Sequence, residues 1–342
     1  MSALPLSDFD YEYPESLIAS SAAEPRDSAR LMVLDRATGR LEHAIFRDLP
    51  RFLKPGDCLV VNRTKVLPCR LLGKKSTGGK ADLLLVNELS PNAWTALASG
   101  FKAGHKLEFP GGMTADVTGL NEEGEYRLDF ATSDLRPYLA EYGLPPLPPY
   151  IAKKRVPSRA DAARYQTVYA RDDGSIAAPT AGLHFTPELL ATLKAKGVRL
   201  AHVTLHVGRG TFRPITSEDA SLHKMLGERY EVEPGEVEII AQARAAGGRV
   251  VSVGTTTTRT LETLARRPEG FGPGRGESSL YISPGFKFQA IDALITNFHL
   301  PRSTPLLLAS AFAGRERLLA AYREAVSLGY RLYSFGDATL VV

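Results

Sequence analysis

The pattern of apolar and polar positions changes twice along this chain of 342 residues. Residues 28–62 hold short apolar segments separated by a turn, as in the strands of a sheet. From about residue 63 to 135, apolar stretches alternate with glycine-containing turns at short spacing, which predicts a small closed β-barrel. After residue 160, strand-like and helix-like segments alternate. That alternation predicts an α/β domain built on a mostly parallel sheet.

Residues typical of helix and strand boundaries locate individual elements in the second half of the chain. Thr186, followed by Pro and Glu, has the chemistry of a helix cap and first turn. Residues 198–207 alternate as a strand, and a buried strand at 250–253 continues directly into a helix through Leu264. We also expect a helix at 237–246, a strand at 292–296, and helices at 304–312 and 315–328.

The changes of pattern divide the chain into an α/β domain interrupted by a barrel. We place the discontinuous α/β domain at residues 1–62 and 156–342, and the inserted all-β barrel at residues 63–155. A proline-rich and then basic connector, residues 143–159, ends the insertion, and its prolines favour an extended backbone. The connector is either a stiff spacer between domains or an arm whose basic residues contact phosphates.

Composition favours a protein of the cytoplasm without membrane segments. The formal net charge is only +4, so charge indicates nucleic acid only where basic residues cluster locally. The two cysteines, Cys58 and Cys69, have neither metal-site nor disulfide-framework spacing. Residues 1–13 are acidic and lack the apolar core of a signal peptide, and no apolar stretch has membrane-spanning length.

Three segments combine polar side chains with glycine or proline beside apolar residues: Ala177–Phe185, Leu205–Phe212 and Leu294–Pro301. Such residues occur together where backbone passes close to a ligand. Imidazole titrates near neutral pH, which suits proton transfer. If the segments meet, their histidines form one site, although a single histidine at such a position is more often a structural hydrogen-bonding residue. These histidines are His184, His206 and His299.

Other motifs leave alternatives open. His202 and His206 have the spacing of a helical metal site, but their neighbours favour a strand, on which they would lie roughly 13 Å apart, so we expect no metal. Gly254–Arg259 joins a strand to a helix and is either an anion-binding helix start or an ordinary capped helix. Asp337 would orient a histidine, bind ribose hydroxyls or cap a turn. Tyr165–Ala170 suits a purine-like ring or core packing.

Longer strings make the sequence similar to one known family. They are Asp8–Pro14, Pro55–Thr64, Pro145–Ile151, Tyr165–Tyr169, Ala177–Phe185, Leu205–Phe212, Val253–Thr256, Thr296–Pro301 and Ser334–Asp337. In this order, from about residue 8 to 340, they resemble the S-adenosylmethionine:tRNA ribosyltransferase-isomerases of queuosine biosynthesis. The chain departs from the family pattern at Leu226, where the family usually has histidine.

The resemblance implies a fold, a reaction and partners. The fold is an α/β domain with an inserted Greek-key barrel. The implied enzyme is a transferase that moves and isomerises the ribosyl moiety of S-adenosylmethionine onto 7-aminomethyl-7-deazaguanine at the tRNA wobble position. Adenine and methionine leave, and the tRNA then carries epoxyqueuosine. The partners are S-adenosylmethionine as cosubstrate and tRNA with a GUN anticodon, without a metal, and we expect a monomer.

That chemistry needs a base for the aminomethyl nitrogen, a base for the carbon next to the sulfonium, and an acid for adenine. The expected catalytic residues are His184, His206, His299, Asp292 and Asp337. The expected S-adenosylmethionine contacts are Thr180, Gly182, Gly208, Thr211, Thr255, Thr256, Arg259 and Asn297. The expected RNA contacts are Lys65, Arg70, Lys74, Lys75, Lys80, Lys153, Lys154 and Arg155. The alternatives are a methyl- or aminopropyl-donor enzyme on the same scaffold and a non-catalytic tRNA-binding protein.

Overall fold

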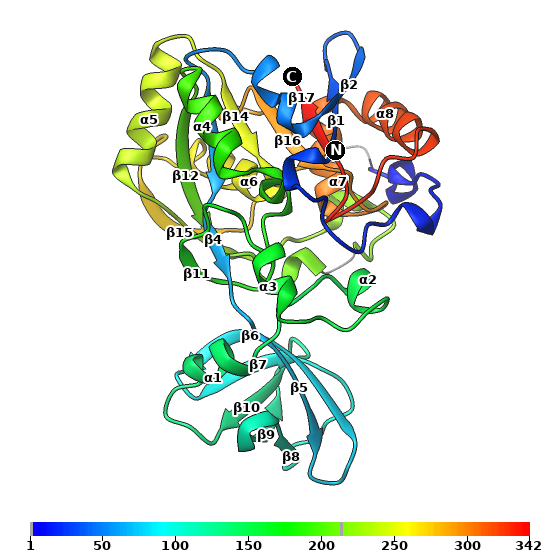
Figure 1. The fold of residues 1–342 in the computed structure, drawn as a ribbon, viewed down its shortest axis with the longest axis vertical. Helices are drawn as coiled ribbons and strands as arrows, with labels where there is room; N and C mark the ends of the chain where they lie inside the picture. Colours follow the sequence, from blue (N-terminus) through cyan, green and yellow to red (C-terminus); the bar gives the residue numbers. More distant parts are fainter. Residues whose placement is uncertain (1–2, 213–214) are drawn as a thin grey trace. The chain divides into compact units, whose positions relative to one another are not determined.

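The computed structural model describes residues 3–212 and 215–342, and the side chains of residues 211 and 212 also lie outside the described part. The chain forms two compact units, each described here by itself (Figure 1). The sheet unit comprises the residues up to Lys65, Gln166–Asp172 and Ala178–Val342, and the barrel unit comprises Val66–Tyr165 and Asp173–Ala177. The chain passes between the units at four points: within β4 (Thr64–Val66), after Tyr165, within β11 (Asp172–Ser175) and after Ala177.

The sheet unit is built on one mixed sheet. Its strands in the described residues run in the order β15 (Gly274–Ser278), β13 (Glu228–Val232), β12 (Arg199–Leu205), β3 (Cys58–Asn62), β14 (Val250–Val253), β16 (Ala293–Asn297), β17 (Ala338–Val341), β1 (Arg30–Leu34) and β2 (Leu41–Ile45). The neighbours from β12 to β16 are parallel, as are β17 and β1. The other neighbours are antiparallel. Four of the eight neighbouring pairs are parallel, so the expectation of a mostly parallel sheet is met at the central strands but not for the sheet as a whole.

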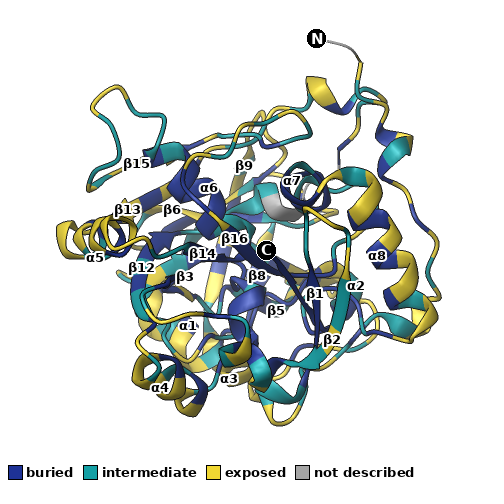
Figure 2. Ribbon diagram, turned by 90° about the horizontal axis from the view of Figure 1, so that it is seen from above, coloured by how far each residue is buried: buried dark blue, intermediate teal, exposed yellow. Residues whose placement is uncertain are grey.

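The central strands are buried on both faces. β3, β14 and β16 contain only buried residues and appear dark blue in Figure 2. On one face, alternate strand residues such as Val61 and Val253 pack against η4 (Phe46–Arg51), η6 (Thr180–His184) and α4 (Pro187–Ala195). A strand buried on both faces is a continuous apolar sequence rather than an alternating one, which explains the pattern of these segments.

Helix α6 (Gly254–Leu264) covers the other face of the central strands. The buried Ser252 hydroxyl of β14 lies 2.9 Å from the Thr258 hydroxyl of α6. The polar side chain of this strand is therefore hydrogen-bonded to the helix, as buried polar groups usually are. α6 contacts β3, β12, β14 and β16, and so lies over the middle of the sheet. The other long helices of this unit are α5 (Pro234–Ala245), α7 (Thr304–Ala313) and α8 (Arg315–Ser327).

The boundary residues recognised in the sequence correctly locate α4 and β12. The Thr186 hydroxyl accepts a hydrogen bond from the Leu189 N–H (3.1 Å), which satisfies one amide of the first turn of α4. Gly197 follows α4 with a φ of +87°, a conformation that glycine adopts without strain. The strand at 198–207 is confirmed as β12. By contrast, the sequence of β15 has no apolar alternation, so the pattern does not predict it.

The barrel unit confirms the expected closed barrel. Its strands lie in the order β10 (Tyr126–Phe130), β7 (Ala93–Leu97), β6 (Lys80–Ser90), β5 (Arg70–Lys75), β8 (Lys106–Glu108) and β9 (Thr114–Leu120), and all neighbours are antiparallel. β5, β6 and β7 follow one another, and β8 then returns to lie beside β5. In β9, Ala115 and Val117 are buried between exposed residues, as expected for a strand with one face toward the barrel interior.

The connector at 143–159 is not extended throughout. It follows α1 (Arg136–Tyr142), contains the single helical turn α2 (Pro149–Ala152), and precedes α3 (Ala160–Arg164). Pro149 occupies the first position of α2, where the missing N–H would have no helical partner anyway. The expectation of an extended backbone is therefore wrong at α2, since proline restrains φ but allows a helix to begin.

Candidate functional site

Four parallel strands of the sheet unit present polar residues at one edge. Asn62 ends β3, His206 follows β12, Gly254 follows β14, and Asn297 ends β16. Since these strands are parallel neighbours, their carboxyl ends lie at the same edge of the sheet. Ligands of open α/β sheets bind outside such carboxyl ends. We call these four strand ends the polar edge, and they form the candidate site.

Asn62 joins three parts of the polar edge. Its Oδ1 accepts hydrogen bonds from the N–H groups of Leu205 (3.1 Å) and Thr64 (3.1 Å). Its Nδ2 donates to the Leu205 carbonyl (3.0 Å) and the Thr256 hydroxyl (3.2 Å). Asn62 is 1% exposed, so these bonds form away from water. The amide therefore fixes the end of β12 and the start of α6 relative to β3.

His206 is held through both its backbone and its ring. Its N–H donates to the Arg229 carbonyl of β13 (2.9 Å), and its Nδ1 lies 2.9 Å from the hydroxyl of buried Thr64. His202, earlier on β12, turns instead to Glu236, with its Nδ1 3.1 Å from Oε1. The two histidines thus have different partners. Within residues 3–212 and 215–342, no group of three His, Cys, Asp or Glu side chains is placed to hold a metal ion.

His184 lies in η6, which packs on β16 and α6. Its ring contacts the Phe46 ring, with centroids 4.9 Å apart. Burial lowers the pKa of His184 to about 4, against the opposing charge of Asp337. The imidazole is therefore neutral at neutral pH. The Asn297 side chain lies close enough to His184 to oppose the lowering of its pKa through a hydrogen bond. His184 Nε2 and Asn297 Oδ1 nevertheless have no well-aligned hydrogen bond among the described residues, so both atoms suit a ligand or an ordered water.

His299 follows β16, and its ring and its carbonyl are both hydrogen-bonded to other residues of the protein. Its Nε2 lies 2.8 Å from the Thr296 hydroxyl, and its carbonyl accepts a hydrogen bond from the Tyr11 hydroxyl (2.6 Å). Burial lowers the pKa of His299 to about 3, so it is neutral as well. This arrangement suits a residue that fixes the loop after β16.

The first turn of α6 suits an anion. Gly254 has a φ of +86°, which allows β14 to turn directly into the helix. The N–H groups of a first helical turn have no partners within the helix, and the helix dipole places positive potential there. Thr255 and Thr256 are partly exposed in this turn. The position of a Gly254 Cβ would lie 3.7 Å from Ala181, so η6 stands beside this helix start.

Arg259 has a different place from the expected one. Its guanidinium pairs with the Glu228 carboxylate and donates to the carbonyls of Ser278 (3.0 Å) and Leu280 (3.1 Å). Glu228 also accepts a hydrogen bond from the Gly208 N–H (2.9 Å). Arg259 therefore supports the segment after β12 through Glu228, and its charge is already matched within the protein.

The two expected aspartates lie at opposite edges. Asp337 is 2% exposed, adjoins Asn297 through β17, and accepts hydrogen bonds from the N–H groups of Arg30 (2.9 Å) and Arg331 (2.7 Å). The side chains of both arginines also pair with it. Asp292 is exposed at the amino end of β16, where it accepts a hydrogen bond from the Val250 N–H (2.8 Å). Asp337 thus adjoins the polar edge, and Asp292 lies at the edge away from it.

The remaining expected S-adenosylmethionine contacts cluster in two segments. Thr180 and Gly182 share η6 with His184, and Gly208 lies directly before η7 (Arg209–Phe212). Thr211 belongs to η7, but its side chain lies outside the described residues. Leu226, the departure from the family pattern, lies against the same segment, since a Cβ at Gly210 would stand 3.4 Å from the Leu226 Cβ.

Gly182 is required by close packing. A Cβ at this position would lie 2.0 Å from the Tyr169 hydroxyl and 2.8 Å from Thr167 Cγ2. We expect Gly182→Ala to lower the free energy of unfolding by about 1–3 kcal/mol, the usual cost of overpacking. Adding Tyr169→Phe removes the nearest atom and is expected to restore part of the loss in chemical denaturation. If the double variant were no more stable than Gly182→Ala alone, the contact with Tyr169 would not be the cause.

The pKa of His184 predicts a pH dependence of stability. An unfolded histidine has a pKa of about 6.5, whereas the buried ring has a pKa of about 4. As the pH falls below about 6.5, the unfolded state takes up the proton first, so stability falls toward pH 4 by up to about 3 kcal/mol. His184→Asn is expected to reduce the slope of a denaturation-against-pH curve in this range, and the slope that remains is expected from His299. Parallel curves for the two proteins would contradict the prediction.

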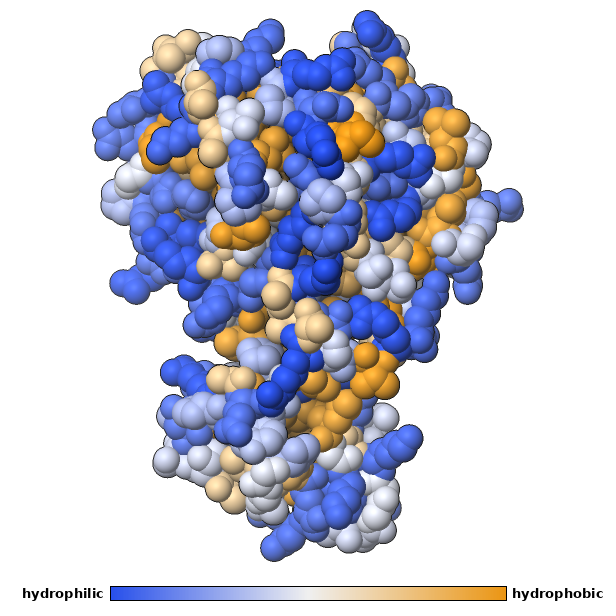
Figure 3. Space-filling model, in the orientation of Figure 1, coloured by the Kyte–Doolittle hydropathy of each residue, from blue (hydrophilic) through white to orange (hydrophobic). Residues whose placement is uncertain are grey.

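Several expected RNA contacts on the barrel unit are ion-paired. The pairs are Arg70–Asp82 (2.6 Å), Lys74–Glu108 (3.2 Å) and Arg155–Asp161 (2.7 Å). Lys75 donates to the Gly100 carbonyl (2.6 Å). Lys65, Lys80, Lys153 and Lys154 are exposed, as is the ion-paired Lys74. Figure 3 shows hydrophilic side chains over much of the visible surface, with smaller hydrophobic areas between them.

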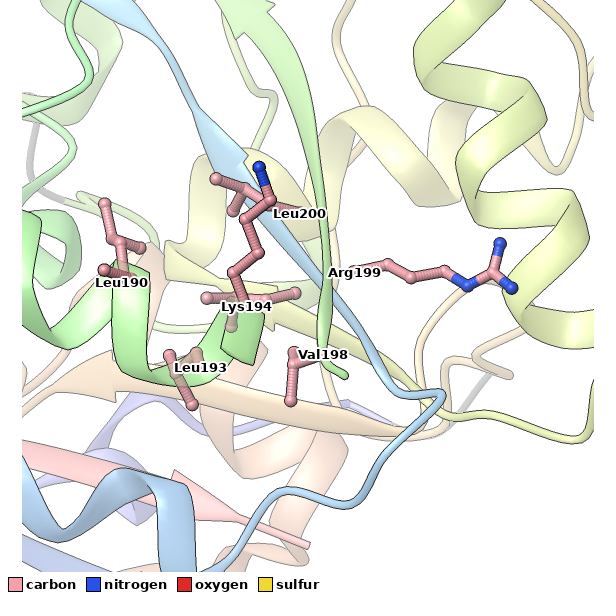
Figure 4. Close-up of a pocket in the computed structure, with 8 residues that line it drawn as sticks. Leu190, Leu193, Lys194, Val198, Arg199 and Leu200 are labelled. Atoms are coloured by element: carbon pink, nitrogen blue, oxygen red, sulfur yellow. The ribbon is translucent and has the colours of Figure 1, made fainter. Parts of the chain in front are cut away.

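An open pocket of about 150 Å³ lies between α4 and β12 (Figure 4). It is lined mainly by apolar side chains and by the stems of two basic ones, including Leu190, Leu193, Lys194, Val198, Arg199 and Leu200. A ligand site has convergent polar groups, and no residue of the polar edge lines this pocket. The pocket is therefore separate from the candidate site.

The mixed sheet with polar residues at the carboxyl ends of its parallel strands, together with a closed barrel, is an α/β architecture of the kind that binds ligands at those strand ends. The family model described as "Queuosine biosynthesis protein" matches residues 6–341. The chain belongs to this queuosine biosynthesis family, as the sequence strings indicate.

Individual relatives match over their full length. An S-adenosylmethionine:tRNA ribosyltransferase-isomerase of Anaeromyxobacter sp. (strain K) is 53% identical, over 98% of this chain and 99% of the relative. The protein of the same name from Symbiobacterium thermophilum is 50% identical over the same shares. The crystal structure of S-adenosylmethionine tRNA ribosyltransferase from Thermotoga maritima is 40% identical, covers 98% of this chain and 100% of that chain, and has a TM-score of 0.58.

Proposed function

We propose that this chain transfers and isomerises the ribosyl moiety of S-adenosylmethionine onto 7-aminomethyl-7-deazaguanine at the wobble position of tRNA with a GUN anticodon. Adenine and methionine leave, and epoxyqueuosine remains in the tRNA. The observation that carries the proposal is the full-length match, at about half identity, to relatives named S-adenosylmethionine:tRNA ribosyltransferase-isomerase. We further propose that the protein acts in the cytoplasm, where its tRNA substrate would be available, and as a monomer.

His206 is the proposed base of the reaction. Among the three candidate histidines, it combines a position on the polar edge with a ring fixed through Nδ1. It would take the proton that the aminomethyl nitrogen loses as that nitrogen attacks the sugar. His184, neutral because of its burial, would hydrogen-bond to the nucleoside through Nε2, together with Asn297. His299 would fix the loop that carries Asn297.

The first turn of α6 would hold the carboxylate of the methionine part of S-adenosylmethionine. Backbone N–H groups and the hydroxyls of Thr255 and Thr256 suit an anion there. Arg259 would not contact S-adenosylmethionine itself. It would position Gly208 through Glu228, whose carboxylate pairs with Arg259 and accepts a hydrogen bond from the Gly208 N–H. S-adenosylmethionine itself would supply the sulfonium, whose positive charge makes the neighbouring carbon acidic and methionine a good leaving group.

The exposed lysines would supply tRNA affinity through phosphate contacts. Neutralised phosphates release counterions, so we expect affinity to fall steeply as salt rises. Replacing Lys80 and Lys153 together by glutamine is expected to reduce the salt slope in a fluorescence-anisotropy titration by about two. Lys287→Gln in the sheet unit is the control. A double variant with the wild-type slope would remove these two lysines from the interface.

The proposed function is tested by product analysis. The protein is incubated with ribose-labelled S-adenosylmethionine and tRNA that carries the precursor base, and the tRNA is then digested for nucleoside mass analysis. Labelled epoxyqueuosine with an equal amount of free adenine is the expected result. Methylated or aminopropylated tRNA without free adenine would indicate another donor enzyme, and binding without any product would indicate a non-catalytic protein.

A further inference from the structure

Thr64 is placed to control the ring of His206. Its hydroxyl lies 2.9 Å from His206 Nδ1, and the residue is fully buried. We propose that Thr64 is a positioning residue that accepts a hydrogen bond from Nδ1–H of His206, so that Nε2 is the nitrogen that exchanges protons with substrate. This inference rests on the proposed function and concerns a residue that the sequence alone does not single out.

Both ends of the contact are fixed by one amide. The N–H of Thr64 donates to Asn62 Oδ1 (3.1 Å), and the same amide bonds to both the N–H and the carbonyl of Leu205. Leu205 directly precedes His206 in the chain, and the N–H of His206 is itself held by the Arg229 carbonyl. The backbone positions that carry the hydroxyl and the imidazole are therefore fixed relative to each other, so the two side chains can form their hydrogen bond without moving the backbone.

The direction of the hydrogen bond decides what the ring can do. A neutral imidazole carries one proton, and a hydroxyl can either donate or accept. If Nδ1–H donates to Thr64, Nε2 has the lone pair that a base needs. If the hydroxyl donates to Nδ1 instead, the proton sits on Nε2, and the ring cannot accept one there. Only the first arrangement serves a reaction in which His206 receives a proton.

The other two histidines lack this arrangement. In His299 the hydroxyl of Thr296 meets Nε2 rather than Nδ1. In His184, Nε2 is the buried atom without a partner in the described part of the chain. A hydroxyl at Nδ1 thus distinguishes His206 from the two histidines of lowered pKa.

Nitrogen NMR tests the tautomer without any substrate. Wild-type protein, Thr64→Val and Thr64→Ser are labelled with ¹⁵N-histidine, and the ring signals of His206 are assigned by their loss in His206→Gln. In the wild type and in Thr64→Ser, the unprotonated, pyridine-like nitrogen is expected to be Nε2. Valine keeps the shape of threonine but cannot accept a hydrogen bond. In Thr64→Val, a large share of the pyridine-like signal is therefore expected to move to Nδ1.

Kinetics test what the tautomer does. Thr64→Val is expected to lower kcat for adenine release roughly 10- to 100-fold, within the range of a misplaced general base, with KM for S-adenosylmethionine little changed. Thr64→Ser is expected to stay within about threefold of wild type, because it keeps the hydroxyl. Thr95→Val is the matched control, since it removes another buried hydroxyl, which accepts from the Asn87 N–H (3.2 Å) in the barrel.

Each result has one meaning. Identical tautomers in wild type and Thr64→Val, or a wild-type proton on Nε2, would overturn the inference. A tautomer change with unaltered kcat would show that Thr64 sets the tautomer of His206. It would also show that His206 is not the base of the proposed reaction. If neither protein releases adenine at all, the proposed function fails, and the NMR result still decides the inference.

Discussion

Replacing His206 by glutamine is expected to lower the rate of adenine release by about 10²- to 10⁴-fold, the usual contribution of a general base. Glutamine keeps polar atoms near Thr64 but cannot take up a proton at neutral pH. The ring is held by its hydrogen bond to Thr64, and the backbone N–H of His206 is held by the Arg229 carbonyl, so the variant removes a base whose position is fixed. The measurement is single-turnover release of adenine with excess enzyme.

The matched control for this variant is His202→Gln on the same strand. His202 is bonded to Glu236 rather than to Thr64, and glutamine can still donate to that carboxylate. The control is expected to remain within about threefold of wild type, because no proton transfer is lost. Equal rates for His206→Gln and His202→Gln would contradict the assignment of His206 as the base.

Replacing Glu228 by glutamine is expected to lower the free energy of unfolding by about 3–5 kcal/mol. Glu228 and Arg259 are 3% and 7% exposed and form a buried ion pair. Glutamine keeps the volume and can still accept from the Gly208 N–H, so the variant removes mainly the charge. The guanidinium is then left buried beside carbonyl groups alone. Chemical denaturation measures the loss.

A surface pair provides the comparison. Asp82→Asn breaks the pair with Arg70, in which the carboxylate side chain is 51% exposed. Water and ions screen such a pair, so we expect a change of about 0–1 kcal/mol. If Glu228→Gln cost no more than Asp82→Asn, burial would not be what makes the Arg259 pair important.

The elements with local signals are those that the sequence predicts well. The cap at Thr186, the glycine turns of the barrel, and the apolar strand that runs into α6 each depend on residues a few positions apart. β15 lacks such a signal, and its place follows from pairing with β13. The antiparallel pairs of the sheet are not predicted for the same reason, since the direction of a strand depends on pairing with residues far away in the chain rather than on the local pattern.

The site shows the same division. The sequence singles out His184, His206 and Asn297 as unusual polar residues, and the structure places His206 and Asn297 at the polar edge, with His184 in η6 near Asn297. It does not single out Asn62, whose amide contacts residues 143 and 194 positions away in the chain. Arg259 has the chemistry of an anion ligand, but the matching acid, Glu228, is 31 positions away and meets it only in the fold. The signal for Asn62 is an amide that ends a fully buried strand.

A crystal structure with S-adenosylmethionine, without tRNA so that no turnover occurs, would locate the donor site. We expect the nucleoside within hydrogen-bonding distance of His184 Nε2 and Asn297 Oδ1, and the methionine carboxylate at the first turn of α6. S-adenosylmethionine bound in the pocket between α4 and β12, or anywhere else away from the polar edge, would contradict this expectation.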